Sequence, residues 1–375
     1  MTETARDIVP LSGAWLDERE EELVLGVLRS GRLSLGPTIE RFEEALAEAV
    51  GAPYAAAVSS GTAGLHLLCR SAGIGPGDEV ITSPYSFAAS ANCFLYEGAT
   101  PVFADVDPRT YNLDPDAVAA AITVRTKAIV AVDIYGYPCE LDPLRDLCER
   151  HGLAFVQDSC EALGAAYRGR RIGSHGVPAV FAFYPNKQLT TGEGGMVTTH
   201  SEEEWRLLRS LRNQGRADSG GWLDHARLGF NYRLSDVAAA IGVAQTEKLD
   251  TILDLRAGAA ARYAALLAEV EGITLPLPDD ADHVRSWFVY VVELDDGIDR
   301  ERVIASLEAD GVQTARYLPV IHLQEYMRDL YGFEEGLCPV AESLGRRTLA
   351  IPFHTRIAEG EQERVAEAVR AALHA

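Results

Sequence analysis

The stretch that most constrains the fold runs over residues 154–199. It contains two short apolar runs, Ala154–Val156 and Val177–Phe183, which have strand length and composition and are bounded by turn residues. The first run leads into Asp158, and the second is followed by Lys187 and a glycine-rich turn. If both runs lie in one sheet, a carboxylate and an amine stand at neighbouring strand ends. Open α/β sheets bind their ligands at that edge.

Lysine is rare in this chain. Its three lysines are Lys127, Lys187 and Lys248, and all other cationic side chains except histidine are arginines. Arginine cannot act as a nucleophile, because it does not lose its proton in proteins. Lys187 is therefore a candidate amine nucleophile that could form a Schiff base. The alternative is a surface or salt-bridging lysine, which is what we expect of Lys127 and Lys248.

Strands and helices alternate along the first two thirds of the chain, which predicts an α/β fold with a mostly parallel central sheet. A long helix is expected after Ser235. Proline, aspartate and glycine then gather around residues 272–282. Beyond them we expect a strand at 287–294, a helix at 300–310, a strand at 312–317 and a closing helix at 359–373. The sequence thus predicts a large domain, residues 1–250, and a small C-terminal α+β domain, residues 251–375.

A possible anion site lies at the start of the helix that follows the apolar run at residues 55–58. The apolar run at residues 55–58 is followed by Ser59, Ser60, Gly61 and Thr62, and then directly by an apolar helix. Free N–H groups and the helix dipole favour a phosphate there, and glycine allows it to approach closely. Many turns of this kind hold no ligand, so the turn alone leaves its role open.

Two motifs in this chain resemble a known signature. D-x-x-x-A-x-G-A begins at Asp158, and F-x-F-x-x-x-K-x-x-T-x-G-E-G-G contains Lys187. They resemble motifs of the DegT/DnrJ/EryC1/StrS aminotransferases, pyridoxal-phosphate enzymes of fold type I that aminate keto-sugars, often nucleotide-linked. S-G-T, P-G-D-E-V, N-Y-R and a C-terminal P-x-H extend the resemblance over nearly the whole chain.

The resemblance implies a role for each matching residue. Lys187 would bind pyridoxal phosphate covalently and later move a proton as general acid and base. Asp158 would pair with the pyridinium nitrogen, and a negative charge there keeps that nitrogen protonated. The other implied cofactor contacts are with Gly61, Thr62, Ala63, Phe87 and Glu161.

The resemblance also implies partners. The amino donor would most plausibly be L-glutamate and the acceptor a keto-sugar. A homodimer would share its sites, with Asn231 reaching the cofactor phosphate of the partner subunit, and His322 would lie near the substrate. Without the family, Phe87 would be a core aromatic, Asn231 an ordinary loop residue and His322 a surface or capping histidine.

Three positions depart from the family pattern. Ala182 stands where a phosphate-binding serine is usual, so N–H groups of the helix start or a water must compensate. Glu161 replaces a glutamine, and a carboxylate would repel the cofactor's 3′-oxygen unless it is protonated or turned away. Asp133 stands where histidine is common.

Charge and composition exclude some classes of function. The net charge is −22 and the pI is about 4.8, which argues against general binding to nucleic acid or anionic membranes. No motif has metal-ligand spacing, so no bound metal is expected. The six cysteines without a CxxC pair and the polar N-terminus predict a cytoplasmic protein without a signal peptide. Two arginine groups could still bind an anionic substrate or simply be solvated: Arg168, Arg170 and Arg171, and Arg209, Arg212 and Arg216.

Other activities remain as alternatives. The acceptor could be a keto-cyclitol. Sugar dehydratases related to this family carry histidine at the lysine position, which Lys187 disfavours. A lyase or desulfurase would need a mobile catalytic cysteine, for which Cys338 is the remote candidate. A non-catalytic regulator is disfavoured because Asp158 and Lys187 are both present.

Overall fold

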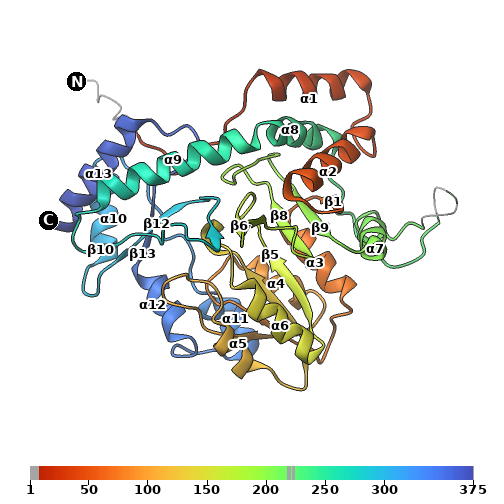
Figure 1. Cartoon of the computed structure of the whole chain (residues 1–375). Coiled ribbons are helices and arrows are strands. Elements are labelled where there is room, and N and C mark those ends of the chain that lie inside the picture. Colours follow the sequence, from red (N-terminus) through yellow and green to blue (C-terminus); the bar gives the residue numbers. More distant parts are fainter. Residues whose placement is uncertain (1–7, 218–220, 222–223, 375) are drawn as a thin grey trace.

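The computed structural model describes residues 8–217, 221 and 224–374 (Figure 1). Most of the N-terminal stretch that we used to argue against a signal peptide lies outside these residues. A seven-stranded sheet forms the centre of the molecule. Its strands, in spatial order, are β1 (Tyr54–Val58), β9 (Gly195–Thr199), β8 (Ala179–Ala182), β5 (Ala154–Asp158), β4 (Thr126–Val132), β2 (Glu79–Thr82) and β3 (Thr100–Phe103).

The central sheet is mostly parallel, as predicted. Strand β9 runs antiparallel to both β1 and β8, and the other neighbouring pairs are parallel. Strand β9 was not predicted, because it depends on pairing with β1, a segment far away along the chain, as well as with β8. The two apolar runs of the sequence are β5 and β8, and they pair directly, with Asp158 opposite Val180. The carboxylate of Asp158 and the lysine beyond β8 therefore belong to the same edge of the sheet.

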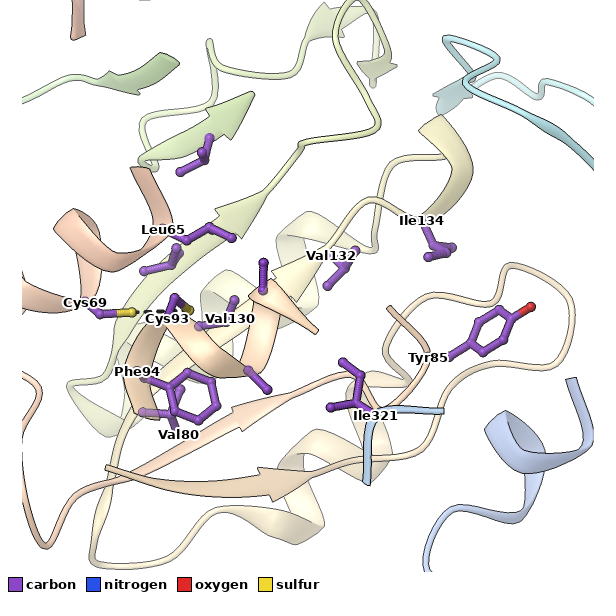
Figure 2. Packing of buried hydrophobic residues seen from close by; sticks show 14 of the residues in the cluster. Leu65, Cys69, Val80, Tyr85, Cys93, Phe94, Val130, Val132, Ile134 and Ile321 are labelled. Carbon is purple, nitrogen blue, oxygen red and sulfur yellow. Dashed lines mark hydrogen bonds between the residues drawn. The ribbon is translucent and has the colours of Figure 1, made fainter. Parts of the chain in front are cut away.

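Helices cover both faces of this sheet (Figure 1). Helices α3 (Gly61–Ser71), α4 (Ala89–Leu95) and α7 (Glu202–Arg212) pack on one face, and α2 (Pro37–Val50), α5 (Pro115–Ala121), α6 (Leu141–His151) and α8 (Asp236–Glu247) pack on the other. Alternation along β4 shows the division: Val130 packs with the first group and Ile129 with the second. Figure 2 shows the first cluster, where Leu65 of α3 and Phe94 of α4 lie over Val130 and Val80.

The long helix expected after Ser235 is two helices. Lys248 separates α8 from α9 (Leu249–Leu267), and its backbone has φ −114° and ψ 14°, outside the helical region. Its side chain donates to Asp17 and Glu20 at the start of α1 (Glu18–Ser30), which packs against α8. These ion pairs tie the junction between α8 and α9 to the start of α1, and they confirm that Lys248 is a salt-bridging residue.

The C-terminal part contains a second, three-stranded antiparallel sheet. Its elements are β10 (Ile273–Thr274), β12 (Tyr290–Leu294), β13 (Thr348–Ile351), α10 (Arg300–Ala309), α11 (Glu325–Tyr331), α12 (Pro339–Arg347) and α13 (Glu359–His374). The strand predicted at 312–317 is wrong. Its backbone forms only isolated bridges, from Val312 to Val9 and from Ala315 to Ala350, so no continuous ladder develops. Strand β13, which we did not predict, takes the place beside β12.

Short elements connect the two parts of the chain. Strand β11 (His283–Val284) pairs with β6 (Ala166–Tyr167), which pairs with β7 (Arg170–Arg171). The one-turn helices η1 (Ile134–Gly136) and η2 (Ile321–Leu323) follow β4 and precede α11. Val9 is buried in the C-terminal core. Because contacts cross residue 250 in this way, the division at that residue stays a prediction.

Among the described residues, no helix combines the length and apolarity needed to span a bilayer.

The contact between α2 and α8 gives a test of the fold. A Cβ atom on Gly242 would lie 2.5 Å from the ring of Phe42, which is fully buried. We expect Gly242→Ala to lower the free energy of unfolding by about 1–3 kcal/mol, because a packed core cannot accept the extra atom. Urea unfolding measures the change.

The matched control is Gly258→Ala in α9. Nothing lies within 4 Å of a Cβ atom at that position. This exchange should leave the stability unchanged or raise it by up to about 1 kcal/mol, because alanine favours helix more than glycine. Equal destabilisation by both variants would contradict the packing described here.

Candidate active site

The centre of the site is the turn Asp158–Glu161, which follows β5. Asp158 is buried, the Ser90 hydroxyl donates to its Oδ2 atom at 2.6 Å, and the Cys160 N–H donates to its Oδ1 atom at 3.2 Å. Ser90 lies in α4, so a helix on one face of the sheet fixes the carboxylate at the strand end. The two donors thus fix both oxygen atoms of this carboxyl group at the strand end.

Lys187 lies in the loop between β8 and β9. Its Nζ atom is 3.6 Å from Oε1 of Glu161 and 3.9 Å from the centre of the Phe288 ring. The side chain is 14% exposed. The lysine therefore points inward, between a carboxylate of the turn and an aromatic ring that precedes β12. It is not a surface lysine, but it is paired with Glu161, as the salt-bridging alternative expects. Lys127, by contrast, is exposed.

Glu161 has a carboxyl group that is buried and fixed in orientation. The Tyr135 N–H donates to its Oε2 atom at 2.9 Å, while Oε1 faces Lys187. Burial raises the pKa of Glu161 above its usual value, although Lys187 and the Tyr135 N–H act to lower it. The sequence suggested a conflict between this carboxyl group and the cofactor's 3′-oxygen; in the structure its Oε1 atom is turned toward Lys187.

The donor to Glu161 comes from a strained turn. Tyr135 in η1 has φ 54° and ψ 24°, a left-handed conformation that side-chain-bearing residues rarely adopt. Asn112 holds this turn: its Oδ1 atom accepts from Ile134 N at 2.9 Å and its Nδ2 atom donates to the carbonyl groups of Tyr137 and Pro138. Strain of this kind is concentrated at functional sites.

Asp133, the departure from the usual histidine, is fully buried at the end of β4. Its carboxylate accepts from the Ser159 hydroxyl at 2.6 Å, from Cys139 N at 2.9 Å and from the Gln157 side chain. Burial raises its pKa, and these donors act in the opposite direction. The side chain thus links η1 to the turn Asp158–Glu161 from within the protein.

The predicted phosphate site is the start of α3. Ser60 caps the helix, and its Oγ atom accepts from Ala63 N at 3.1 Å. Gly61 and Thr62 belong to the first turn, so their N–H groups have no acceptor within the helix. Two of the three predicted phosphate ligands therefore keep an N–H group that is free of the capping bond.

Glycine is required at the start of α3. A Cβ atom at Gly61 would lie 2.7 Å from Sγ of Cys160 and 2.8 Å from Cβ of Ala182. The helix start therefore touches both the turn after β5 and the end of β8. These contacts bring the free N–H groups, Asp158 and Lys187 to one part of the sheet edge, as a cofactor with an aldehyde, a ring nitrogen and a phosphate would need.

Three further residues predicted for the site differ in their exposure to solvent. Phe87 follows β2 and is 66% exposed, so it is not a core aromatic. Asn231 is exposed and forms a bridge with Asn213. His322 is fully buried, and its Nε2 atom lies 2.9 Å from Oε1 of Glu342. Their roles toward cofactor and substrate remain predictions.

Other candidates have structural partners. Four arginines of the two groups pair with carboxylates: Arg168 with Asp142, Arg171 with Asp250, Arg209 with Glu40 and Arg212 with Glu43. Cys338 is buried, and burial raises the pKa of its thiol to about 12, which disfavours a reactive thiolate. Within the described residues, no group of histidine, cysteine, aspartate and glutamate side chains is placed to hold a metal ion.

Comparison with known proteins identifies the family. A model of the DegT/DnrJ/EryC1/StrS aminotransferase family matches residues 15–370. The chain belongs to this family. It is 36% identical to the spore coat polysaccharide biosynthesis protein SpsC of Bacillus subtilis over 99% of this chain and 98% of that protein. It is 40% identical to the GDP-perosamine synthase of Caulobacter vibrioides over 94% of this chain and 95% of the synthase.

A solved structure agrees with this assignment. The Streptococcus pneumoniae protein Spr1654 in its PLP-form superposes with a TM-score of 0.93 at 26% identity, over 98% of this chain and 99% of that chain. As a member of the DegT/DnrJ/EryC1/StrS family, the protein has fold type I and is a pyridoxal-phosphate-dependent sugar aminotransferase. The predictions of family, fold class, enzyme class and cofactor are thereby confirmed.

The geometry also contains residues that the motifs of this aminotransferase family did not indicate. They are Ser90, Tyr135 and Phe288. Tyr135 could have been noticed, because it lies in the D-I-Y-G segment that carries the Asp133 departure. Ser90 and Phe288 gave no local signal, since each reaches the site only through the packing of α4 and of the C-terminal part.

Gly61 provides a test of the cofactor site. We expect Gly61→Ala to weaken pyridoxal-phosphate binding by about tenfold or more, because the added methyl group must push the helix start away from Cys160 and Ala182. Titration of the cofactor-free chain, followed by visible absorbance, measures the affinity. Gly75→Ala, with open space around its Cβ position, should bind normally. Normal binding by Gly61→Ala would contradict the proposed contact.

Proposed function

We propose that the protein transfers an amino group from L-glutamate to the carbonyl carbon of a nucleotide-linked keto-sugar. One observation carries the proposal: the inward-pointing Lys187 lies at the same sheet edge as the buried carboxyl group of Asp158 and the glycine start of α3. This is the set of groups that binding of an aldehyde, a ring nitrogen and a phosphate requires.

The nature of the acceptor rests on relatives. The GDP-perosamine synthase is 40% identical to this chain, and SpsC is a polysaccharide biosynthesis protein. A GDP-linked keto-sugar is therefore the first acceptor to test. A keto-cyclitol is the alternative acceptor within the same chemistry. The dehydratase alternative remains disfavoured because a lysine, rather than a histidine, stands at position 187.

Each of these residues then has its own role in the proposed reaction. When bound, pyridoxal phosphate supplies an electron sink for the negative charge that develops at a carbon atom. Asp158 would pair with the ring nitrogen of the cofactor at the strand end, and the N–H groups of Gly61 and Thr62 would hold its phosphate. Lys187, once its amine is free, takes a proton from one carbon and returns it to another.

A second copy of the chain would complete the site. Phe87 and Tyr184, on loops after β2 and β8, are 66% and 53% exposed, and Asn231 is also at the surface. Further large apolar side chains are exposed near the N-terminus: Leu16, Leu25, Leu28, Leu33 and Leu35. We propose that these surfaces are covered in a homodimer, with Asn231 reaching the phosphate of the partner's cofactor.

The decisive comparison is Lys187→Ala against Lys127→Ala. Removal of Lys187 should abolish covalent attachment of the cofactor and lower amino transfer by at least about 10²–10⁴-fold, because a general acid–base group is lost. Removal of the exposed Lys127 should change neither. Borohydride trapping followed by mass spectrometry locates the attachment.

Activity is measured as 2-oxoglutarate and aminated sugar formed from glutamate and a panel of keto-sugars and keto-cyclitols. Transfer to a GDP-linked keto-sugar supports the proposal. Transfer only to a keto-cyclitol would select the alternative acceptor. Undiminished turnover in Lys187→Ala would overturn the assignment of the lysine.

A further inference from the structure

We propose that Glu161 is the counter-charge of the free Lys187 amine and makes this lysine a stronger base than a glutamine at position 161 would. The carboxylate would stabilise the ammonium group that forms when Lys187 has taken up a proton. The consequence for catalysis rests on the proposed function, whereas the electrostatic effect itself is a property of the protein chain.

The first argument is geometric. Oε1 of Glu161 lies 3.6 Å from Nζ of Lys187, and both side chains are largely buried. The Tyr135 N–H holds Oε2 at 2.9 Å, so the carboxyl group cannot turn its other oxygen away without losing a bond. Gln188, the residue after the lysine, donates to the Glu161 carbonyl group and to the Ser286 hydroxyl. The Tyr135 N–H thus holds the carboxyl group of Glu161, and the side chain of Gln188 ties the segment of Lys187 to the backbone of Glu161.

The second argument is that Glu161 is the nearest anion to the lysine. In the described part of the chain, no other carboxylate oxygen lies within 4.0 Å of Nζ of Lys187. Asp158 is the other nearby carboxylate, but the Ser90 hydroxyl and the Cys160 N–H engage both of its oxygen atoms. A charge at 3.6 Å in a buried site acts strongly on its partner, because little water screens it.

Three further titratable groups that interact with Glu161 are neutral. They are the phenols of Tyr135 and Tyr317 and the thiol of Cys160. Burial raises the pKa of each of these groups, so none carries a charge near neutral pH. The charge that acts on Lys187 at close range therefore comes from Glu161, with Asp158 behind it.

Glutamine at position 161 is the informative substitution. Glu161→Gln removes the charge, yet its amide oxygen can still accept from the Tyr135 N–H. The variant also restores the residue that is usual in the family at this position. Any change in Lys187 then reports the charge and not a lost hydrogen bond.

The chain is well suited to measure this effect. With three lysines in the sequence, each falls into a separate peptide, and Lys127 and Lys248 serve as internal standards. The full-length chain, freed of pyridoxal phosphate, is labelled briefly with acetic anhydride over a range of pH values. Mass spectrometry gives the labelling rate of each lysine, and only the neutral amine reacts.

We expect Glu161→Gln to raise the labelling rate of Lys187 at pH 7–8 by about tenfold or more, because the ammonium form loses its counter-charge. Lys127 and Lys248 should not change. In the holoenzyme, the pH midpoint of the visible absorbance of the cofactor should fall, as the positive charge on the lysine nitrogen is then less stable.

The pH dependence of Lys187 labelling in the wild-type protein gives a second test of the charge on Glu161. Burial raises the pKa of Glu161, so its charge is lost at a higher pH than for an ordinary glutamate as the solution is acidified. Below that pH, Glu161 is neutral, as glutamine is. The pH profiles of Lys187 labelling in the wild type and in Glu161→Gln should therefore coincide below that pH and separate above it.

A matched control removes a different buried carboxylate. Glu43 is as buried as Glu161, accepts from Ala57 N at 2.8 Å and pairs with Arg212. Glu43→Gln should leave the labelling of Lys187 unchanged. If Glu161→Gln does not fold, Glu161→Asp keeps the charge and should keep slow labelling, whereas fast labelling in Glu161→Asp counts against the proposal.

The outcomes separate this inference from the proposed function. Unchanged or slower labelling of Lys187 in Glu161→Gln overturns the inference, even if the enzyme transfers amino groups. Faster labelling in a chain that aminates no keto-sugar supports the counter-charge and overturns the proposed function. Equal effects of Glu161→Gln and Glu43→Gln would show a general loss of structure and overturn the inference.

Discussion

The rest of the site depends on one turn, Asp158–Glu161, at the end of β5. Asp158 is held from α4, Cys160 touches the start of α3, and Glu161 faces Lys187. Ser159 donates to the buried Asp133 after β4. Four consecutive side chains thus connect four separate elements. Because β5 lies in the middle of a sheet covered on both faces, the turn cannot move without disturbing the core.

Buried polar groups around this turn are costly, and the carboxyl groups of Asp133, Asp158 and Glu161 each accept hydrogen bonds. Asp133 accepts three kinds of donor, and Asn112 holds the left-handed turn at Tyr135. An unpaired buried carboxylate would be neutral or would destabilise the fold. These bonds therefore stabilise a strained backbone in the one arrangement that points an N–H group at Glu161. The exchange of the usual histidine for Asp133 belongs to this support and faces the interior of the protein.

The sequence predicted much of the fold, because strand composition and turn residues are local signals. The strands at 154–158 and 179–182 and the helices around them appear where expected, and the two runs pair directly. Three errors have a common cause. Strand β9, the break at Lys248 and the absence of a strand at 312–317 each depend on which distant segment supplies the partner. A single local window does not contain that information.

The sequence by itself determined the chemical groups of the site and the elements that bear them: a rare lysine, an aspartate at a strand end and a glycine that starts a helix. The resemblance of its motifs to those of the DegT/DnrJ/EryC1/StrS aminotransferases also indicated the family and, through it, the cofactor. Only the tertiary structure decided which groups touch. It placed Phe288 beneath Lys187, buried His322 against Glu342 and turned Glu161 toward the lysine. The physical reason is that burial and charge pairing depend on distances across the fold, which the order of residues along the chain does not specify.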